Sequence, residues 1–355
     1  MDILLICGKP IAEDALTCLP GAPGHRPAPE YGKEILMDDN INIKKTTGTY
    51  LSADKKNNLF YCVMTPDTPP MGVIQLIHGE AGMTECYDVF ARSFARRGFV
   101  VCGADLPGHG NSADDEDRGS FDGAYLTADI EELRLIMRRR YRSLPYFLLG
   151  QGVGSFIAMS YIVQYRDAAD GVILSGIGSV DRIKSDIFVS GLLMKLRGKD
   201  YRSRWLKNRT EKGRNDRFRD EKSALSWLTG DAEMRRVYED DPRCNFIYTA
   251  GAYNEMFKIM RDVSAEDWAP SVPKGLPVLI AAGRDDTLGG YGSAPQQVCD
   301  RLQDAEIFEL SLKFYNGRND ILNDTDRETV YAELYEWLTD VREGVLACRV
   351  PTPLF

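Results

Sequence analysis

One stretch decides the fold of this chain: Phe147-Leu148-Leu149-Gly150-Gln151-Gly152-Val153-Gly154-Ser155. An apolar run ends in three glycines at alternate positions, and apolar residues at helical spacing follow between positions 156 and 162. This pattern predicts a buried strand that turns sharply into a buried helix. Glycine is the residue that adopts the backbone conformations of such a turn most readily.

The spacing of the three glycines matches the nucleophile elbow, G-x-S-x-G, in which a strained turn exposes a serine above an α/β sheet. Gly150 and Gly154 occupy the flanking positions of that motif. The serine position, however, is Gly152. The stretch therefore predicts the frame of a hydrolase elbow without its nucleophile.

The composition limits the class of protein. A chain of 355 residues is long enough for one large α/β domain with an insertion. No apolar run reaches the roughly 18 residues that a membrane span needs, and the run at 3–6 is too short for the core of a signal peptide. The net charge of -9 argues against nucleic acid as a partner. The eight cysteines show no C-x-x-C motif, so we expect a reducing cytoplasm.

The rest of the chain alternates strand and helix patterns on either side of the elbow. Apolar or alternating segments predict strands at 46–51, 58–64, 72–78, 99–104, 171–175, 276–282 and 307–314. Helical spacing is found at 87–94, 126–141, 297–302 and after a capping box at 325–328. This order predicts a mostly parallel sheet with helices on both faces.

Three segments lie outside that alternation. Residues 1–43 are rich in proline and glycine and are predicted to be an N-terminal extension on the surface. Residues 177–270 are helical in character and interrupt the core, which consists of residues 44–176 and 271–341. An insertion there would lie over the carboxyl ends of the strands, where ligands bind in such sheets, so we predict a helical cap. Residues 342–355 are predicted to be a C-terminal tail.

Five motifs occur in a fixed order along residues 45–340. They are His78-Gly79 after a strand, Asp105-Leu106-Pro107-Gly108-His109-Gly110-Asn111-Ser112, the elbow, Gly283-Arg284-Asp285-Asp286, and Tyr315-Asn316-Gly317-Arg318-Asn319-Asp320. With them the chain resembles the α/β-hydrolase superfamily, and within it the monoacylglycerol lipase and lysophospholipase-like branch of serine aminopeptidase S33 type. The resemblance implies an α/β-hydrolase fold with an inserted cap.

The resemblance also assigns roles by position. In that family a serine attacks an ester carbonyl, a histidine takes its proton, and an aspartate orients the histidine. The nucleophile position is Gly152, the acid position is Asp286, and the base position is Asn319. Gln151 precedes the nucleophile position, where the family usually has histidine. The oxyanion amides would be those of Glu80 and Val153.

These departures remove the chemistry that the family performs. Gly152 cannot form an acyl-enzyme, and Asn319 has no basic nitrogen that could move a proton near pH 7. In a serine protease, losing the nucleophile or the base costs about 10⁶-fold in rate. Oxyanion stabilisation and binding alone retain on the order of 10³–10⁴-fold over water.

The carboxylate of Glu80 raises a further question about the oxyanion position. If it points inward it repels a developing negative charge, and the other interpretation is that it points to solvent, because unpaired glutamate is rarely buried. Asp286 is expected to be solvated or hydrogen-bonded to Asn319, and Asp320 to be a surface or loop-capping carboxylate.

The few remaining candidate groups offer no substitute for the missing nucleophile and base. The chain has three histidines, and we expect structural roles for His78 and His109. Ser155 is predicted to be a packing residue at the start of the helix. No cluster of metal-ligand residues and no phosphate-binding glycine loop is present, so no cofactor is predicted.

A basic segment of the predicted cap indicates a possible partner. Its cations are Lys195, Arg197, Lys199, Arg202, Arg204, Lys207, Arg209, Lys212, Arg214, Arg217 and Arg219. Apolar residues at roughly helical spacing precede it: Val189, Leu192, Leu193 and Leu196. The segment could bind an anionic membrane surface or an acidic partner, or it could be a solvated face whose apolar residues form the core of the cap.

Together these observations predict a non-hydrolytic pseudoenzyme that binds an acyl or other apolar small molecule between cap and core. Two alternatives stay open. One is an active carboxylic-ester hydrolase with a non-standard mechanism, in which water attacks directly, and the other is an interaction protein that acts through its basic cap. The sequence leaves the ligand and the oligomeric state open.

Overall fold

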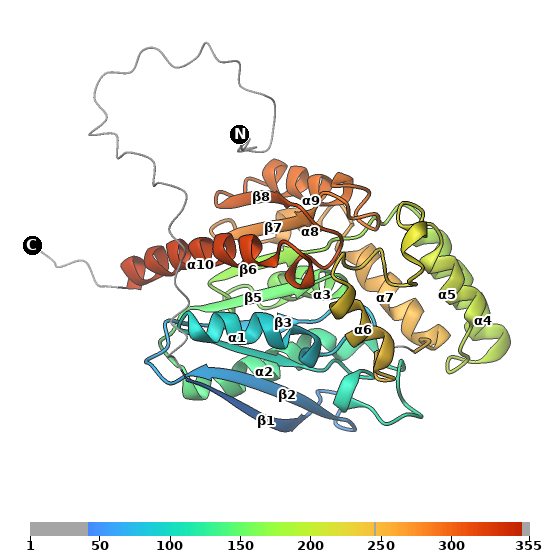
Figure 1. Ribbon diagram of the computed structural model, residues 1–355, viewed down its shortest axis with the longest axis horizontal. Coiled ribbons are helices and arrows are strands. Elements are labelled where there is room, and N and C mark those ends of the chain that lie inside the picture. Colours follow the sequence, from blue (N-terminus) through green and yellow to red (C-terminus); the bar gives the residue numbers. More distant parts are fainter. Residues whose placement is uncertain (1–41, 245, 350–355) are drawn as a thin grey trace, which may run out of the picture.

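The computed structural model describes residues 42–244 and 246–349 (Figure 1). Nearly all of the predicted N-terminal extension, and residues 350–355 of the predicted tail, lie outside the described residues.

An eight-stranded sheet forms the centre of the molecule, in the order β1-β2-β4-β3-β5-β6-β7-β8. The strands are β1 (Ile43–Leu51), β2 (Asn58–Pro66), β3 (Gly72–Ile77), β4 (Phe99–Ala104), β5 (Tyr146–Gln151), β6 (Gly171–Ser175), β7 (Val278–Gly283) and β8 (Leu310–Tyr315). β2 pairs antiparallel with both β1 and β4, and every other pair is parallel. The predicted mostly parallel sheet is confirmed.

The central strands are buried along their whole length, as the continuous apolar runs in the sequence predict. Helices cover both faces of the sheet (Figure 1). α1 (Asp88–Arg96) and α10 (Arg327–Arg349) pack on one face with apolar residues of β3, β4 and β5. α2 (Leu126–Arg140), α3 (Val153–Gln164) and α9 (Ser293–Asp304) belong to the opposite side. α10 continues to Arg349, so the segment from 342 predicted as a tail is helical over its described part.

Residues 176–277, between β6 and β7, are called the insertion here. They contain α4 (Ile183–Arg197), α5 (Arg204–Glu211), α6 (Ala232–Asp240), α7 (Ala250–Asp262) and the short α8 (Trp268–Ser271). The helical character predicted for residues 177–270 is therefore present. α4 to α7 gather at one end of the sheet (Figure 1), and Tyr253, Met256 and Phe257 of α7 are buried with Ile183 of α4 and Leu206 of α5 in a core of their own.

Within residues 42–244 and 246–349, every helix is too short or too polar to cross a lipid bilayer.

Candidate functional site

The turn between β5 and α3 has the backbone geometry of a nucleophile elbow. Gly152 has φ 55° and ψ -119°, a region that residues with side chains occupy only under strain. Its N–H donates to the carbonyl of Ser175 on β6 at 2.8 Å, and its own carbonyl accepts from the N–H of Ser155 at 3.0 Å. The strained turn is thus fixed by hydrogen bonds on both sides.

The three glycines of the elbow differ in what surrounds them. A Cβ at Gly150 would lie 2.5 Å from the carbonyl oxygen of Gly154, and one at Gly154 would lie 2.1 Å from the carbonyl oxygen of Ile77. At Gly152 the nearest atoms to a Cβ would be Cα of Gly79 at 3.6 Å and Oδ1 of Asn319 at 3.9 Å, which are ordinary contacts. Packing therefore requires glycine at positions 150 and 154, whereas at 152 only the positive φ favours it.

Ser155 stabilises the elbow from below. Its fully buried hydroxyl donates to the carbonyl oxygens of Gly150 and Ser175, each at 2.7 Å, and accepts from the N–H of Ser175 at 3.0 Å. Because the hydroxyl is turned into the β5–β6 junction, Ser155 is a structural residue, as predicted.

Asn319 takes the place of the base and bonds directly to the acid. Its Nδ2 donates to Oδ2 of Asp286 and to the carbonyl of Gly176, each at 3.1 Å. Nε2 of Gln151 donates to the carbonyl oxygen of Asn319 at 3.0 Å. All three side chains are buried. Asp286 and Asn319 are therefore joined by an amide–carboxyl hydrogen bond, and the network contains no imidazole.

Asp286 is the hydrogen-bond acceptor at one end of this network. Its Oδ1 accepts from the N–H groups of Leu288 and Gly289, at 2.9 and 3.0 Å. Burial raises the pKa of Asp286 to about 6, against the opposing effect of these amides and of the Asn319 bond. The hydrogen bond to Asn319 confirms one of the two environments expected for this carboxyl.

Glu80 points inward and is paired, so the interpretation that it points to solvent is wrong. Its Oε2 lies 3.0 Å from a guanidinium nitrogen of Arg214, and the two side chains are only 16% and 9% exposed. The guanidinium also lies over the ring of Trp227, 4.6 Å from its centroid. Arg214 comes from the insertion, between α5 and α6, and supplies the partner that makes burial of Glu80 tolerable.

A cavity of about 400 Å³ opens between the sheet and the insertion, and Gly152 lies in its wall. Both positions assigned to the oxyanion hole, Glu80 and Val153, line it as well. Much of the remaining wall is apolar: Phe156, Val180, Ile183, Tyr253, Met256, Phe257, Met260 and Leu288. Residues of the elbow and of the insertion therefore line the same cavity.

A smaller hollow of about 30 Å³ adjoins the elbow and shares Glu80, Gly152, Val153 and Leu288 with the larger one. Gln151 and Asn319 also line it. Oε1 of Gln151 is buried and accepts no hydrogen bond from any described residue. Gln151 therefore carries a buried acceptor without a partner among the described residues, in the wall of this hollow.

His78 and His109 have the structural roles predicted for them. Nε2 of His78 accepts from the N–H of Leu106 at 2.9 Å, and burial lowers the pKa of its imidazole to about 4. Nε2 of His109 accepts from the hydroxyl of Tyr248 at 2.7 Å, and burial, followed by the neighbouring His78, lowers its pKa to about 3. Neither histidine lines the two hollows. Both are neutral near pH 7 and hold neighbouring loops through hydrogen bonds.

Asp320 differs from the sequence prediction. It is fully buried rather than exposed, and its Oδ2 accepts from the hydroxyl of Tyr238 at 3.1 Å and from Nδ2 of Asn323 at 2.9 Å. Burial raises its pKa to about 6. Since Tyr238 belongs to α6, the carboxyl joins the insertion to the loop that carries Asn319.

The basic segment divides into two groups. Five of its eleven cations form ion pairs within the protein: Lys207 with Glu211, Arg209 with Asp186, Arg214 with Glu80, Arg217 with Asp285 and Arg219 with Asp216. Arg202 donates to the carbonyls of Ile247 and Glu116. Lys195, Arg197, Lys199, Arg204 and Lys212 are exposed and have no ion pair with any described residue.

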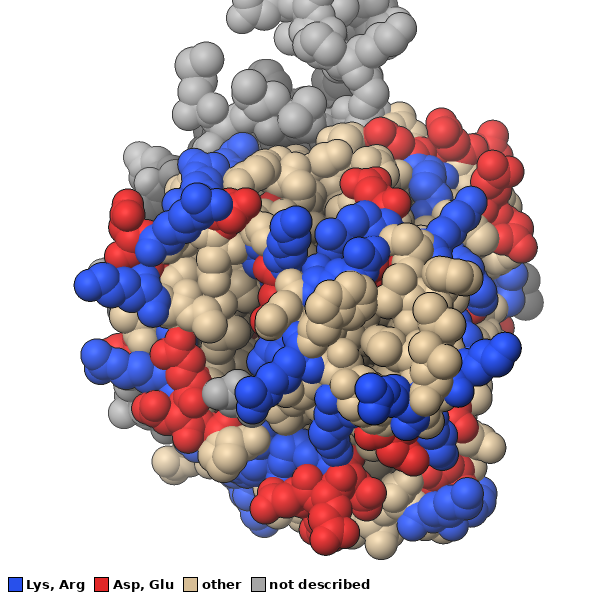
Figure 2. Space-filling view, turned by 90° about the vertical axis from the view of Figure 1, so that its right-hand side faces the viewer, with Lys and Arg blue, Asp and Glu red and all other residues tan. Residues whose placement is uncertain are grey.

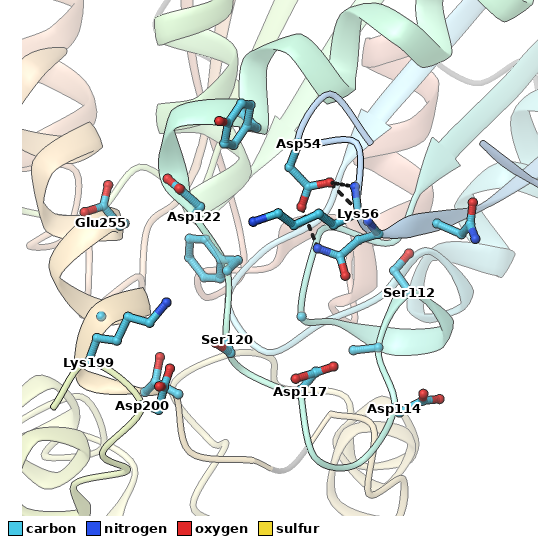
Figure 3. A pocket seen from close by; sticks show the side chains of 18 of the residues that line it. Asp54, Lys56, Ser112, Asp114, Asp117, Ser120, Asp122, Lys199, Asp200 and Glu255 are labelled. Carbon is cyan, nitrogen blue, oxygen red and sulfur yellow. Dashed lines mark hydrogen bonds between the residues drawn. The ribbon is translucent and has the colours of Figure 1, made fainter. Parts of the chain in front are cut away.

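A third hollow of about 670 Å³ is polar and lies elsewhere, beside the turn between β1 and β2 (Figure 3). Asp54, Asp117, Asp122 and Glu255 line it, and Asp54 bonds to the backbone N–H of Lys56 within its own turn. Among the described residues no group of three or more side chains is arranged to hold a metal ion.

The sheet order, the elbow and the acid after β7 define an α/β-hydrolase fold. Residues 68–326, well over half of the chain, match the family described as Serine aminopeptidase, S33. The chain belongs to this family.

Two curated proteins show what the chain is similar to. The monoacylglycerol lipase of Mycolicibacterium smegmatis is 32% identical over 118 residues, 33% of this chain and 42% of that protein. An uncharacterised abhydrolase domain-containing protein of Dictyostelium discoideum is 24% identical over 305 residues, 84% of this chain and 29% of that protein. The matched segments thus span less than half of either relative.

Solved structures agree on the fold. A thermostable carboxyl esterase from Bacillus coagulans, crystallised with glycerol, has a TM-score of 0.78 at 25% identity and covers 84% of this chain and 99% of its own. The monoglyceride lipase of Saccharomyces cerevisiae has a TM-score of 0.66 at 19% identity, covering 81% and 92%. The predicted resemblance to the monoacylglycerol lipase branch is confirmed.

Sequence reasoning missed the part that Arg214, Trp227 and Tyr238 play in this site. Arg214 stands in a run of cations that looks solvated, and no local pattern separates it from its neighbours. The unpaired glutamate after His78-Gly79 was the one available signal, because a buried carboxylate requires a cationic partner somewhere.

Proposed function

We propose that this protein is a non-hydrolytic member of its family, which binds an amphiphilic small molecule with an acyl or other apolar chain. One observation carries the proposal: the elbow keeps its strained geometry around a glycine, while Asn319 at the base position is bonded to Asp286. A hydroxyl nucleophile and an imidazole base are both needed for the family's reaction. Neither is present at this turn.

The larger cavity supports the choice of ligand. A volume of about 400 Å³ is within the range of small-molecule sites, and its apolar wall suits an acyl chain. The polar end suits a head group that donates a hydrogen bond, because Oε1 of Gln151 is a buried acceptor without a partner among the described residues. We expect a chain with one hydroxyl or amide at its head, which binds without being cleaved.

Native mass spectrometry of the freshly purified full-length protein tests the binding. We expect a co-purified small molecule, and Leu288→Trp, which fills the cavity wall, should lower its occupancy. Leu135→Trp, at an exposed position of α2, is the matched control. Equal occupancy in both variants would place the molecule outside this cavity and contradict the proposal.

The absence of turnover is tested separately. We expect no labelling by a serine-directed fluorophosphonate probe and no hydrolysis of monoacylglycerol or p-nitrophenyl esters. The open alternative is hydrolysis by a water that attacks directly, for which we name Glu80 as the base, because this carboxylate lines both the cavity and the small hollow at the elbow. Saturable esterase activity that disappears in Glu80→Gln would establish that alternative and overturn the proposal.

A second function is favoured by an exposed apolar row on the insertion. We propose that α4 and α5 dock onto an anionic lipid surface. Phe188, Leu192 and Leu196 recur every four residues along α4 and are 71%, 45% and 68% exposed. Trp205 of α5 is 59% exposed. Val189 and Leu193, included in the predicted interfacial helix, instead pack toward the core of the insertion.

The charges around this row favour lipid over an acidic protein. Figure 2 shows Lys and Arg side chains around uncharged surface at this end of the molecule, and four of the five exposed cations without ion pairs lie between Lys195, near the end of α4, and Arg204, at the start of α5. An apolar face that enters the acyl boundary beside cations is the pattern of an interfacial helix. An acidic protein would use the cations and make little use of the apolar row.

Sedimentation with vesicles tests the docking. We expect binding to vesicles with phosphatidylserine, weaker binding to phosphatidylcholine alone, and loss of binding in Phe188→Ser combined with Leu196→Ser. Phe308→Ser removes an equally exposed aromatic residue from the loop before β8 and is the matched control. If Lys195→Glu and Arg204→Glu abolish binding while the apolar variant binds normally, the lipid proposal is wrong and an acidic partner is favoured.

We propose a cytoplasmic location from the spacing of the eight cysteines, which shows no disulfide framework. Cell fractionation tests this proposal, and recovery in a secreted fraction would contradict it.

A further inference from the structure

Two thiols from distant parts of the chain are in contact near the site. Cys86 lies in the short 3-10 helix Thr84–Tyr87 (η1) of the core, and Cys244 lies in the insertion after α6. Their sulfur atoms are 3.7 Å apart, although the residues are 158 positions apart in sequence. Both side chains are buried, and both are free thiols in this structure.

The residues next to the two cysteines hold the segments in register. Arg243, immediately before Cys244, forms an ion pair with Glu85, immediately before Cys86, at 3.0 Å. Arg243 also donates to Oδ1 of Asn111 at 2.9 Å. The contact between the two sulfurs is therefore part of a defined docking of the insertion onto η1.

This docking lies beside the candidate site. Tyr87, the residue after Cys86, and Tyr238 of α6 both line the small hollow at the elbow, together with Gln151 and Asn319. The chain that leads into η1 carries Glu80, which lines both hollows. A covalent bond at Cys86 and Cys244 would fix the insertion to the core at the edge of the ligand cavity.

We propose that Cys86 and Cys244 are a modification site, at which a small-molecule disulfide of the glutathione type converts the two thiols into an intramolecular disulfide. A disulfide requires a sulfur–sulfur distance of about 2.05 Å, so the two sulfurs must approach each other further. The adjacent ion pair between Arg243 and Glu85 already holds the two segments next to each other.

The exchange balances without any further reagent. The thiolate of one cysteine attacks a sulfur of oxidised glutathione and releases one glutathione thiolate. The second cysteine then attacks the protein sulfur of the mixed disulfide and releases the second glutathione. Two protein thiols are oxidised to one disulfide, one molecule of oxidised glutathione is reduced to two thiols, and the protons pass to glutathione.

The surroundings make the thiols slow to react while the insertion is docked. Contact with Cys244, followed by burial, raises the pKa of the Cys86 thiol well above its ordinary value. Since the thiolate is the attacking species, exchange requires the segment that carries Cys244 to lift from η1. The disulfide then closes when the segment docks again, and it keeps the insertion closed over the cavity.

Peptide mapping of the full-length protein tests the bond. In a Cys348→Ser background, which removes an exposed thiol, incubation with oxidised glutathione should lower the intact mass by two hydrogen atoms. Trypsin together with a glutamate-specific protease should release a linked pair of peptides that contain Cys86 and Cys244. The link should be absent in Cys86→Ser and in Cys244→Ser, and present in Cys102→Ser, which removes another buried cysteine.

Arg243→Gln adds a kinetic readout, because it removes the ion pair with Glu85. The linked peptides should form several-fold faster in this variant, since the segment opens more often. If both cysteines of the oxidised wild-type protein remain open to alkylation, or carry glutathione without the link, the proposal is overturned.

The effect on the cavity rests on the proposed ligand binding and is measured separately. In the linked protein a bound molecule should leave several-fold more slowly than from the reduced protein. The linked peptides test whether the disulfide forms, and this test does not depend on finding a ligand. A missing ligand would therefore count against the proposed binding function alone.

Discussion

At the scale of single residues, Gly152 shows the difference between a glycine that packing demands and one that it permits. The turn holds φ 55° there, yet a side chain would meet only ordinary contacts. Gly150 and Gly154 have no such room. The elbow frame is therefore retained for structural reasons that do not depend on a nucleophile.

This difference predicts unequal effects of alanine. Gly152→Ala should lower the free energy of unfolding by about 1–3 kcal/mol, the cost of a strained backbone region. Gly154→Ala should cost more, because its Cβ would lie 2.1 Å from the carbonyl oxygen of Ile77 on a buried strand. Urea denaturation measures both. Equal losses would show that the elbow relaxes around a side chain.

Restoring the family's residues predicts a second outcome at this scale. Gly152→Ser alone should remain inert toward a fluorophosphonate probe, because no base would take the hydroxyl proton. Gln151→His, Gly152→Ser and Asn319→His together should be labelled, since Asp286 is already hydrogen-bonded to residue 319. A triple variant that folds but resists labelling would mean that Glu80 and Arg214 also oppose the reaction.

At the scale of elements, the insertion is joined to the core through side chains near the elbow. Arg214 bonds to Glu80, and Tyr238 of α6 bonds to Asp320 before α10. Glu80 lines the cavity, so its contact with Arg214 bears both on the position of the insertion and on the electrostatics of the cavity, whereas Asp320 lies next to Asn319 and is fully buried.

The Glu80–Arg214 pair predicts a large loss when one partner is removed. Arg214→Met leaves Glu80 buried without a cation and should cost up to about 3 kcal/mol in the free energy of unfolding. Glu80→Gln in the same molecule should recover part of that loss. Arg217→Met breaks an exposed pair with Asp285 and should cost about 1 kcal/mol or less. Losses of the same size in both single variants would contradict the buried pairing.

At the scale of the whole molecule, three of the buried carboxyl groups, in different parts of the fold, have a raised pKa. They are Asp129 on α2, Asp286 after β7 and Asp320 after β8. Burial raises the pKa of each to about 6. Between the unfolded value near 4 and this folded value, the native state binds more protons than the unfolded state. The free energy of unfolding that each group contributes therefore falls as the pH rises from about 4 to about 6.

The direction of this pH dependence of stability can be measured for Asp286. The stability of the wild type relative to Asp286→Asn should fall as the pH rises from about 4 to about 6, by up to about 1.4 kcal/mol per pH unit, and should stay constant above that. Denaturation curves at a series of pH values give this difference. Asp285→Asn, which removes the exposed carboxyl one residue away, is the matched control. A difference that grows with pH would contradict the raised pKa.

Much of the fold was predictable because its signals are local. The continuous apolar runs at 72–78 and 99–104 predicted β3 and β4 almost to the residue, since a strand buried on both faces needs apolar residues throughout. The ends of the last helix were harder, and α10 continues beyond the predicted boundary at 341. The mixed residues there give no stop signal such as proline or glycine until Gly344, which the helix includes.

By itself the sequence determined the order of strands and helices, the strained turn at Gly152, and the lack of a hydroxyl and an imidazole at the positions where the family has them. These properties depend on periodicity and on residue identity at motif positions, which a chain carries locally. Only the tertiary structure decided that Arg214 neutralises Glu80, that Asp320 is buried and that Cys86 meets Cys244. Each of these depends on which distant segments are brought together when the insertion docks on the sheet. Burial then requires a partner for each charge, because an unpaired charge is costly in a dry interior.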